Sequence, residues 1–399
     1  MKVAINGVGI AGPTLAYWLR RYGHEPVLFE ESRALRSGGY IIDFWGLGHE
    51  IAERMGILPE LRRKCYEMRT MRLVDGMGRP RATTDLAPMR EALGGRFFSI
   101  ARADLSAALF GACAGVRTHF GVSVAGLEQD EAGVVVTRSD GERERFDVVI
   151  GADGLHSHVR ALAFGPEREF ERFLGCYVAA VRLKGYPHRD ELTYVSHTVP
   201  GRQVARVSLR DDETLVLFVS RSDWFPEQPA RDQLPGALQR VFADLGWEVP
   251  AILKALDRAE DIYFDRVSQT FLPRWTSGRV ALVGDAAACP SLLAGEGSGL
   301  AMIGAYVLAG ELHQAGGNVA RAGAAYERRL RAFVTKKHRG AVRLRGFFVP
   351  RSRLSLGVRD LAVRVLSTRF FGGRLLAASL RDGFELPAYA GGSEGVELS

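Results

Sequence analysis

The stretch Val3–Gly12 reads VAINGVGIAG and gives the clearest indication of how the chain folds. A short apolar run enters a glycine-rich turn, a helical pattern follows from Pro13 to Tyr22, and a second apolar run ends at Glu30. Glycines at this spacing permit a tight turn and close approach of the backbone to a pyrophosphate, and the N-terminus of the following helix stabilises that anion. The turn residues predicted to contact a dinucleotide are Gly7, Gly9, Ile10, Ala11 and Gly12.

An acidic residue after the second strand of such a unit binds a ribose hydroxyl. Two candidates are adjacent, and Glu30 is favoured over Glu31 because it directly ends the apolar run. A glycine turn between a strand and a helix also occurs without a nucleotide. Here strand, turn, helix, strand and acid follow in order within the first 31 residues, which favours a dinucleotide site over a purely structural turn.

A second glycine-rich motif lies far from the first. The apolar run Val280–Val283 is typical of a buried strand, it ends in a glycine turn and one carboxylate, and a helix is expected to begin near Gly297. Ser298 is the candidate N-cap of that helix. The N–H groups and dipole of the helix N-terminus would stabilise negative charge on a bound group, and its apolar residues would also pack in the core. The predicted residues of this half-site are Gly284, Asp285, Gly295, Gly297, Ser298 and Gly299.

A third motif lies mid-chain, where the apolar run Phe146–Ile150 continues into GADGLHSHVR. Its glycines permit a close turn, Asp153 can orient the neighbouring backbone or contact the nucleotide, and Ser157 is a candidate helix cap. Arg160 is expected either to reach a phosphate or to pair with Asp153. Taken alone, the motif is as compatible with an ordinary Asp-Gly turn as with a ligand site.

Length and composition narrow the class of protein. A chain of 399 residues with 47% hydrophobic residues suggests two or three domain-sized units with large cores. The chain starts at once with a strand and has no run of 18 apolar residues, so we expect a cytoplasmic protein without stable membrane association. The four cysteines lack C-x-x-C spacing and the nine histidines form no H-E-x-x-H pattern, which favours free thiols and argues against a metal site.

The net charge of +7 is unevenly distributed. Residues 335–381 contain 12 Lys and Arg against one Asp, which gives +11 and leaves about −4 for the rest of the chain. We expect this segment to form amphipathic helices that pack their apolar faces on the body and expose arginine. The alternative is a patch for an acidic partner or a membrane surface. No aromatic residues are interleaved with the basic ones in the manner of a recognition motif, so nucleic-acid binding is not predicted.

The three motifs, in this order and at these separations, resemble the three fingerprints of class A FAD-dependent monooxygenases, the single-component aromatic hydroxylases of the para-hydroxybenzoate hydroxylase type. The chain looks most similar to the tetracycline-inactivating flavin monooxygenases and the hydroxylases of aromatic polyketide pathways. The segments that carry this closer resemblance are Gly38–Asp43, Ile100–Leu105 and Trp275–Val280. The similarity covers residues 3 to about 333.

The resemblance implies FAD as cofactor, with NADPH or NADH as a transient reductant and O2 as co-substrate. It implies that a flavin C4a-hydroperoxide hydroxylates a bulky aromatic or polyketide-like small molecule, in antibiotic or natural-product biosynthesis or inactivation. Arg102 would contact the ribityl or phosphate region of FAD, Asp153 would serve the loop shared with the nicotinamide cofactor, and Asp285 would bind a ribityl hydroxyl. The flavin performs the chemistry, so no catalytic side chain is assigned.

The implied fold class is α/β, with a Rossmann-like FAD-binding domain, an inserted substrate domain built on an antiparallel sheet, and a C-terminal helical segment. The FAD-binding domain is expected to comprise residues 1–75, 98–172 and 270–333, and the substrate domain residues 76–97 and 173–269. A basic helical segment spans 334–390 and a tail 391–399. The protein is expected to be a monomer or a homodimer.

Substrate contacts are predicted from the expected flavin edge and from the β-rich segment. Tyr40 and Arg206 are preferred, because stacking and one charged contact would hold a bulky aromatic molecule. Tyr194 and His197 lie in the same β-rich region, and ordinary packing is the alternative for every one of these residues. The predicted substrate residues are Tyr40, Asp43, Tyr177, Arg206, Phe218 and Leu292.

The third fingerprint departs from the family pattern, which reads G-D-A-A-H, then proline, then G-Q-G-x-N. This chain has Ala288, Leu292, Glu296 and Gly299 at those positions, with Pro290 two residues early. The alternatives are therefore an FAD-dependent dehydrogenase, reductase or halogenase on the same scaffold, although the halogenase signature W-x-W-x-I-P is absent. A non-catalytic FAD-binding protein that sequesters a ligand is a further alternative.

Overall fold

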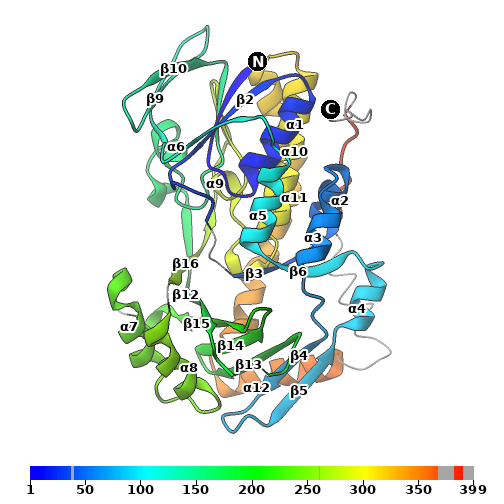
Figure 1. Cartoon of the computed structure of the whole chain (residues 1–399), viewed down its shortest axis with the longest axis vertical. Coiled ribbons are helices and arrows are strands. Elements are labelled where there is room, and N and C mark those ends of the chain that lie inside the picture. The colour runs from blue at the N-terminus through cyan, green and yellow to red at the C-terminus, as the bar shows by residue number, and fades with distance from the viewer. Residues whose placement is uncertain (37–39, 188, 226, 260, 367–381, 390–399) are drawn as a thin grey trace.

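A computed structural model of the chain describes residues 1–36, 40–187, 189–225, 227–259, 261–366 and 382–389. Figure 1 shows an elongated molecule with two lobes, one around a largely parallel sheet and one around a larger sheet at the opposite end. This mixed α/β architecture confirms the predicted fold class. Gly38 and Gly39 of the family-like segment, residues 367–381 of the basic segment and the predicted tail 391–399 lie outside the described residues.

The first lobe is built on a six-stranded sheet in the order β17-β18-β11-β1-β2-β7. The strands are β1 (Lys2–Asn6), β2 (Glu25–Glu30), β7 (Arg117–Phe120), β11 (Val148–Gly151), β17 (Thr276–Ser277) and β18 (Val280–Leu282). All neighbours except the β17–β18 pair are parallel, and the central strands are apolar because both faces of the sheet are covered. Strands β1, β11 and β18 are adjacent and each ends in one glycine-rich motif. The three motifs therefore meet at one edge of the sheet.

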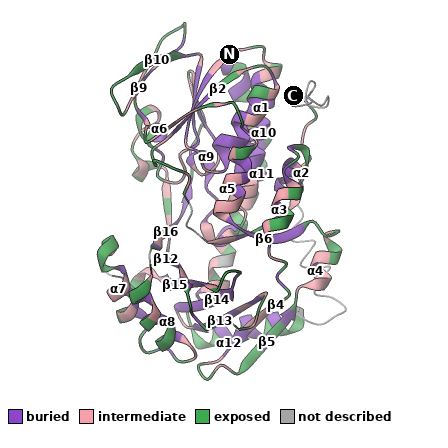
Figure 2. Ribbon diagram, in the orientation of Figure 1, coloured by how far each residue is buried: buried purple, intermediate pink, exposed green. Residues whose placement is uncertain are grey.

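Helices pack against this sheet and against one another. They are α1 (Ala11–Arg21), α5 (Arg102–Gly111), α6 (His158–Ala163), α9 (Asp285–Ala288), α10 (Gly297–Gln314) and α11 (Val319–Phe348). Helices α1 and α10 lie side by side, with the rings of Trp18 and Tyr306 in an edge contact at 4.9 Å. Helix α10 is apolar around its circumference and buried along most of its length, as Figure 2 shows. The helix whose start was predicted near Gly297 is thus the central helix of the lobe.

Smaller elements complete the first lobe. A two-stranded ribbon pairs β3 (Ile41–Trp45) with β6 (Phe97–Ala101), and helices α2 (Gly46–Arg54) and α3 (Leu58–Lys64) follow β3. A three-stranded antiparallel sheet has the order β10-β9-β8. Its strands are β8 (Val124–Gln129), β9 (Val134–Arg138) and β10 (Arg143–Phe146).

The second lobe is a seven-stranded sheet in the order β16-β12-β15-β14-β13-β4-β5. Its elements are β4 (Thr70–Val74), β5 (Pro80–Asp85), α4 (Ala87–Ala92), β12 (Glu171–Lys184), β13 (Thr193–Val199), β14 (Arg202–Ser208), β15 (Glu213–Arg221), α7 (Leu234–Phe242), α8 (Val249–Ala255) and β16 (Ile262–Thr270). Strand β4 pairs with β13 and β5, so it belongs to this sheet. The predicted boundary after residue 75 separated β4 from β5, and the structure moves the boundary to the segment before β4.

Alternating side chains give this sheet two different faces. The outer face, defined as the face that α7 and α8 cover, carries Tyr177, Val204 and Phe218. The inner face carries Ala180, Val207 and Leu215, and it packs against Tyr40 and Ile41 of the first lobe. Because successive residues of a strand point to opposite faces, only every second position of these strands is directed toward the first lobe.

The basic C-terminal segment connects the lobes. Helix α11 begins at the first lobe, where Tyr326 donates to the Leu282 carbonyl, and ends at the second, where Arg345 donates to the Leu174 carbonyl. Helix α12 (Arg353–Leu366) then packs on β5 and β13. Residues 382–389 return to the first lobe, where a Cβ on Gly310 would meet the Tyr389 ring at 2.2 Å.

Helix α12 differs from the amphipathic arrangement that the sequence predicted. It buries Leu356 and Val363 as expected, but it also buries Arg359 and Asp360, which pair with each other at 2.7 Å. Four apolar side chains instead face solvent, with exposed fractions of 58 to 79%: Leu354, Val358, Leu361 and Val365. Within the described part of the chain, every helix is too short or too polar to cross a bilayer.

Candidate functional site

The first glycine turn is built around close backbone contacts. A Cβ on Gly12 would lie 1.9 Å from the Gly7 carbonyl oxygen, and one on Gly7 would lie 2.5 Å from the carbonyl oxygen of Ala152 in the mid-chain motif. Gly7 also adopts a φ of 111°, a backbone conformation that favours glycine. A Cβ on Gly9 would meet only Arg102 Nη2, at 3.7 Å, among the described residues. Gly7 and Gly12 are therefore required by the fold, whereas Gly9 leaves room for a ligand to approach the turn.

Glu30 closes the first turn from the end of β2. Its Oε2 accepts from the Val8 N–H at 2.8 Å and its Oε1 from the Ser32 N–H at 3.0 Å. The carboxylate is thereby held at the turn, while Glu31 is exposed. Ile10 and Ala11 are buried where the turn enters α1. The preference for Glu30 agrees with this placement, and its contact with a ribose stays a prediction.

In the mid-chain motif, Asp153 orients the backbone. Its carboxylate accepts from Asn6 Nδ2 and the Val159 N–H, both at 3.0 Å, and from the Ser157 hydroxyl at 2.5 Å. Ser157 caps α6 by accepting from the Arg160 N–H at 3.0 Å, which confirms the predicted cap. Asp153 thus ties the mid-chain motif to the end of β1.

The prediction for Arg160 is wrong. Its side chain is fully buried, and it donates to the carbonyl oxygens of Ala286 at 3.1 Å and Leu155 at 2.6 Å instead of pairing with Asp153. Glu167 accepts a further hydrogen bond at 3.3 Å. A buried guanidinium satisfies its several donors with carbonyl oxygens. Arg160 therefore joins the mid-chain motif to α9 and is not free to bind a phosphate.

Asp285 begins α9 directly after Gly284, which has a φ of 64°. Burial raises the pKa of the Asp285 carboxyl, and the positive charge of Arg102 and a hydrogen bond with Cys289 act against that rise. Arg102 begins α5, and its backbone N–H donates to the Tyr40 carbonyl at 3.1 Å. Arg102 thus approaches both Gly9 of the first motif and Asp285 of the third. The structure brings together three predicted sites that are far apart in the sequence.

The N-terminus of α10 lies beside Asp285, whose Oδ1 is 3.7 Å from the position of a Cβ on Gly297. The helix begins at Gly297 as predicted, but Ser298 does not cap it, because Glu296 occupies the N-cap position and its side chain makes no capping hydrogen bond. The first N–H groups of a helix have no partner within the helix. The first turn of α10, which includes Ser298 and Gly299, therefore offers backbone donors and a positive dipole end to an anionic or carbonyl group.

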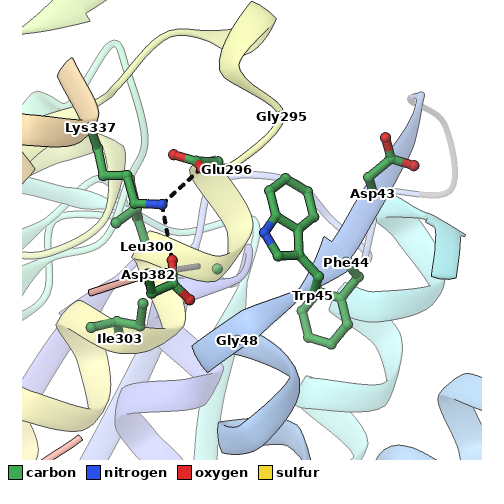
Figure 3. A pocket seen from close by; sticks show the side chains of 11 residues that line it. Asp43, Phe44, Trp45, Gly48, Gly295, Glu296, Leu300, Ile303, Lys337 and Asp382 are labelled. Atoms are coloured by element: carbon green, nitrogen blue, oxygen red, sulfur yellow. Dashed lines mark hydrogen bonds and ion pairs between the residues drawn. The ribbon is translucent and has the colours of Figure 1, made fainter. Parts of the chain in front are cut away.

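A pocket opens between β3 and the start of α10 (Figure 3). Gly295, with a φ of 68°, lies so near the Trp45 indole that a Cβ on it would be 3.9 Å from the ring. Asp43 is exposed in this pocket and accepts a hydrogen bond from the Ser99 hydroxyl at 2.5 Å. The residues that line the pocket are Asp43, Phe44, Trp45, Gly48, Gly295, Glu296, Gly299, Leu300, Ile303, Lys337 and Asp382.

The predicted substrate residues fall into two groups. The first group lies at the junction of the lobes and comprises Tyr40, Asp43 and Leu292. The Tyr40 ring packs against Tyr263 with the ring centres 5.6 Å apart, and Leu292 packs against buried residues of β12 and β16. Burial raises the pKa of the Tyr40 hydroxyl to about 12, so it is protonated at neutral pH. Tyr194 also packs with the inner-face residues.

Tyr177, Phe218 and Arg206 lie on the outer face, so the prediction that they contact a substrate does not agree with the structure. Tyr177 packs with Phe225 and Phe264, and Phe218 packs with Phe242 of α7. Arg206 is 1% exposed at its side chain and pairs with Glu248 at 2.8 Å and Asp190 at 2.7 Å. His197 Nδ1 donates to the Val74 carbonyl at 3.2 Å. These residues lie on strands of the seven-stranded sheet, as predicted, but the sequence alone did not indicate to which face their side chains point.

Several polar residues at the junction of the lobes were not predicted from the sequence to be functional. The Tyr263 hydroxyl donates to Asp265 at 3.1 Å, and His156 lies 3.4 Å from Asp265 and 2.9 Å from Glu167. The two-residue spacing of Tyr263 and Asp265 on a strand was a usable signal, since it places both on one face. Glu296, Lys337 and Asp382 also meet at the pocket, and no local spacing relates these three residues.

The arrangement fits a flavin dinucleotide. Gly9 leaves space beside the first turn, the positive charge of Arg102 acts on the Asp285 carboxyl, and the start of α10 presents backbone N–H groups. An extended ligand with a pyrophosphate, hydroxyl groups and an electron-accepting ring could use all three features. Among the described residues, no group of acidic, histidine and cysteine side chains could hold a metal ion.

Comparison with known proteins gives the same assignment. A family model described as an FAD binding domain matches residues 1–343. A flavin-dependent monooxygenase from an unknown prokaryotic organism is 36% identical over 343 residues, which cover 84% of this chain and 86% of that one. Another flavin-dependent monooxygenase, from Legionella longbeachae, is 32% identical over 98% of each chain. The crystal structure of tetracycline destructase Tet(51) has a TM-score of 0.79 at 32% identity, with 97% of this chain and 99% of that chain covered. That of Tet(55) has a TM-score of 0.83 at 29% identity. The chain therefore belongs to the class A FAD-dependent monooxygenases.

Proposed function

We propose that this FAD-dependent monooxygenase hydroxylates a bulky aromatic or polyketide-like small molecule, with NADPH or NADH as transient reductant and O2 as co-substrate. The proposal rests on the position of the predicted FAD site next to the seven-stranded sheet. The edge where the three glycine motifs converge faces the inner face of the seven-stranded sheet, and Tyr40 and Tyr263 pack together at the junction. The similarity to solved tetracycline destructases supports a large, fused-ring substrate.

Each sequence motif would hold a different portion of FAD. The turn from Gly7 to Gly12 and Glu30 would bind the ADP portion, and Arg102 and Asp285 would bind the central portion. Asp153 would keep the mid-chain turn in shape through its hydrogen bonds to Asn6 and Ser157. Bound FAD supplies the redox chemistry, accepting a hydride and activating O2.

The chain itself would orient the substrate and exclude water. The N–H groups at the start of α10, around Gly297 and Gly299, would stabilise negative charge on the ring system that they face. Tyr40, with a protonated hydroxyl, and Leu292 would form the wall between that ring system and the sheet. Apolar inner-face residues such as Ala180 and Leu215 would exclude solvent from the reacting atoms. Asp43 would accept a hydrogen bond from a polar substituent of the substrate.

We further infer that the enzyme acts in the cytoplasm, as a monomer or a homodimer, in the biosynthesis or inactivation of natural products. All four cysteines are free and buried, which suits a reducing compartment. The nicotinamide cofactor would bind transiently, because the sequence carries a single dinucleotide turn of the Gly7–Gly12 type.

The test is isotope incorporation by the purified, FAD-loaded enzyme. Tetracyclines and linear aromatic polyketides would be screened for stimulation of NADPH and NADH oxidation, and products formed under ¹⁸O2 would be analysed by mass spectrometry. We expect one ¹⁸O atom per product molecule, with a control lacking substrate to measure unproductive oxidation. Substrate-independent NADPH oxidation that yields only hydrogen peroxide would contradict the proposal and favour an oxidase or reductase.

A further inference from the structure

Three charged side chains from distant parts of the chain meet at the start of α10 (Figure 3). Lys337 Nζ, on α11, lies 2.8 Å from Glu296 Oε1 and 2.9 Å from Asp382 Oδ1. The three side chains are only 11 to 19% exposed. Glu296 occupies the N-cap position of α10, and Asp382 belongs to the segment that returns from the second lobe. We call these residues the charge triad.

The charge triad holds the two sides of the pocket together. Glu296 is continuous with the Gly297–Gly299 turn on one side. On the other side, Asp382 Oδ2 accepts from the Leu47 N–H at 2.8 Å, at the start of α2. Helix α2 crosses α10 so closely that a Cβ on Gly48 would lie 2.9 Å from Gly299 Cα. Lys337 is therefore the link between the start of α10 and the β3–α2 segment.

The charges of the triad do not cancel. Two carboxylates surround one ammonium, so the fully ionised cluster carries a net charge of −1. Burial alone would lower the pKa of Lys337, but its hydrogen bond to Glu296 and the charge of Asp382 outweigh burial and raise it. Burial raises the pKa of Glu296, and Lys337 acts against that rise. Lys337 is thus the shared counter-ion of two carboxylates beside the helix start.

We propose that Lys337 is a positioning residue for the flavin: it fixes the start of α10 and offsets the carboxylates of Glu296 and Asp382, so that this helix end stabilises the negative charge of the reduced flavin. The proposal rests on the placement of the flavin at the start of α10 given above. It also accounts for Glu296 standing where the family pattern has glutamine, because the added carboxylate has its counter-ion in Lys337.

The proposal predicts opposite effects of two substitutions of similar size. Lys337→Met leaves two carboxylates without a counter-ion, so the reduced, more negative flavin is destabilised and its midpoint potential becomes more negative. Glu296→Gln leaves the Lys337–Asp382 pair and removes one negative charge, so the potential becomes more positive. A purely structural role would weaken flavin binding in both variants and would not reverse the sign of the potential shift.

The experiment measures the flavin midpoint potential of the full-length holoenzyme against reference dyes at pH 8. We expect a roughly tenfold shift of the oxidised-to-reduced equilibrium in each variant, in opposite directions, which is about 30 mV for a two-electron couple. Lys337→Arg should restore a value near that of the wild type. FAD affinity, from quenching of flavin fluorescence, should fall about tenfold for Lys337→Met.

Glu311→Gln is the matched control. Glu311 lies on the same helix, is buried and pairs with Arg329, but it is 15 residues from Glu296, which is roughly 22 Å along a helix. Its substitution should leave the potential unchanged. If Lys337→Met does not yield folded protein, Asp382→Asn serves as a second test and should shift the potential in the same direction as Glu296→Gln.

Shifts of the same sign in Lys337→Met and Glu296→Gln, or no shift in either, would overturn the role of Lys337 even if the wild-type enzyme hydroxylates a substrate. A wild-type chain that binds no FAD would contradict the proposed function itself. The two failures are therefore distinguishable.

Discussion

The edge of the parallel sheet and the seven-stranded sheet use glycine and strand residues in different ways. At the edge of the parallel sheet, Gly7 and Gly12 are fixed by backbone atoms only 2.5 and 1.9 Å from the positions their Cβ atoms would take. In the seven-stranded sheet, each strand presents one set of side chains to the first lobe and the other to α7 and α8. At the edge of the parallel sheet, particular positions accept almost no residue other than glycine. In the seven-stranded sheet, the role of a residue depends on the face to which its side chain points.

Function can be read from a sequence motif at the edge of the parallel sheet, whereas in the seven-stranded sheet it depends on strand register. A glycine turn is marked in the sequence by the glycines themselves, because close backbone contacts such as that of Gly12 with the Gly7 carbonyl leave no room for a side chain. A strand residue has no such marker, because a shift of one position moves its side chain to the opposite face. Arg206 shows the consequence: it lies on the predicted strand, but its guanidinium is paired with Glu248 on the outer face.

The largest effect that separates the two regions is expected within the first glycine turn. Gly12→Ala places a Cβ against the Gly7 carbonyl, so the turn must open, and we expect a loss of about 3 kcal/mol of unfolding free energy. FAD affinity should fall at least about 100-fold. Gly9→Ala is the matched variant, since among the residues that the structure describes its Cβ would meet only Arg102, at 3.7 Å. Its stability should stay near that of the wild type while FAD binding weakens. Urea denaturation and fluorescence titration with FAD measure the two effects, and equal stability losses would contradict the assigned geometry.

The next effect concerns the outer face. Arg206→Met removes the buried cation of this ion-pair cluster and leaves Asp190 with Arg72 alone and Glu248 with the more exposed Arg189 alone. We expect a loss of about 3 kcal/mol in unfolding free energy, at the low end of the range for breaking a buried ion pair. The KM for substrate of the remaining folded enzyme should be unchanged. Arg143→Met, which breaks an exposed pair with Glu128, should cost less than about 1 kcal/mol. A large rise in KM for Arg206→Met without loss of stability would restore Arg206 as a substrate contact.

The sequence was sufficient for the parallel sheet, the start of α10 and the convergence of three motifs, because each depends on a glycine turn after an apolar run. It also identified Ser157 as a cap, since the capping residue and the helix are local to each other. Arg160 was misjudged because its partners, the carbonyls of Ala286 and Leu155, are backbone atoms that a sequence does not single out. The charge triad could not be found, since Glu296, Lys337 and Asp382 are brought together only by the packing of three segments.

A smaller effect should distinguish the two faces of the sheet directly. Tyr263→Phe on the inner face removes the hydroxyl that donates to Asp265, a hydrogen bond worth about 1 kcal/mol. We expect a roughly fivefold fall in kcat/KM for the hydroxylated substrate. Tyr177→Phe on the outer face is the control and should leave kcat/KM unchanged, because Tyr177 packs among Phe225 and Phe264. Steady-state oxygen consumption with coupled product analysis measures both, and equal effects would mean that the faces are not functionally distinct.

The smallest effect should arise where the two regions touch. Hydrogen bonds to Asp265 on the sheet and to Glu167, together with their charges, raise the pKa of His156 to about 9, although burial acts in the opposite direction. Because the pKa is higher in the folded state than the ordinary value of about 6.5 for an unfolded chain, the stabilisation is fully present below pH 6.5. It is lost as the pH rises through 9.

The His156 side chain is 56% exposed, so solvent screening limits this contribution to less than about 1 kcal/mol. We expect the difference in unfolding free energy between the wild type and His156→Gln to be largest near pH 6 and to vanish by pH 10. Urea denaturation across that range measures it. A difference that instead grew with pH would show that His156 is neutral in the folded protein, and the junction between the lobes would then be held by packing such as the Tyr40–Tyr263 contact and not by charge.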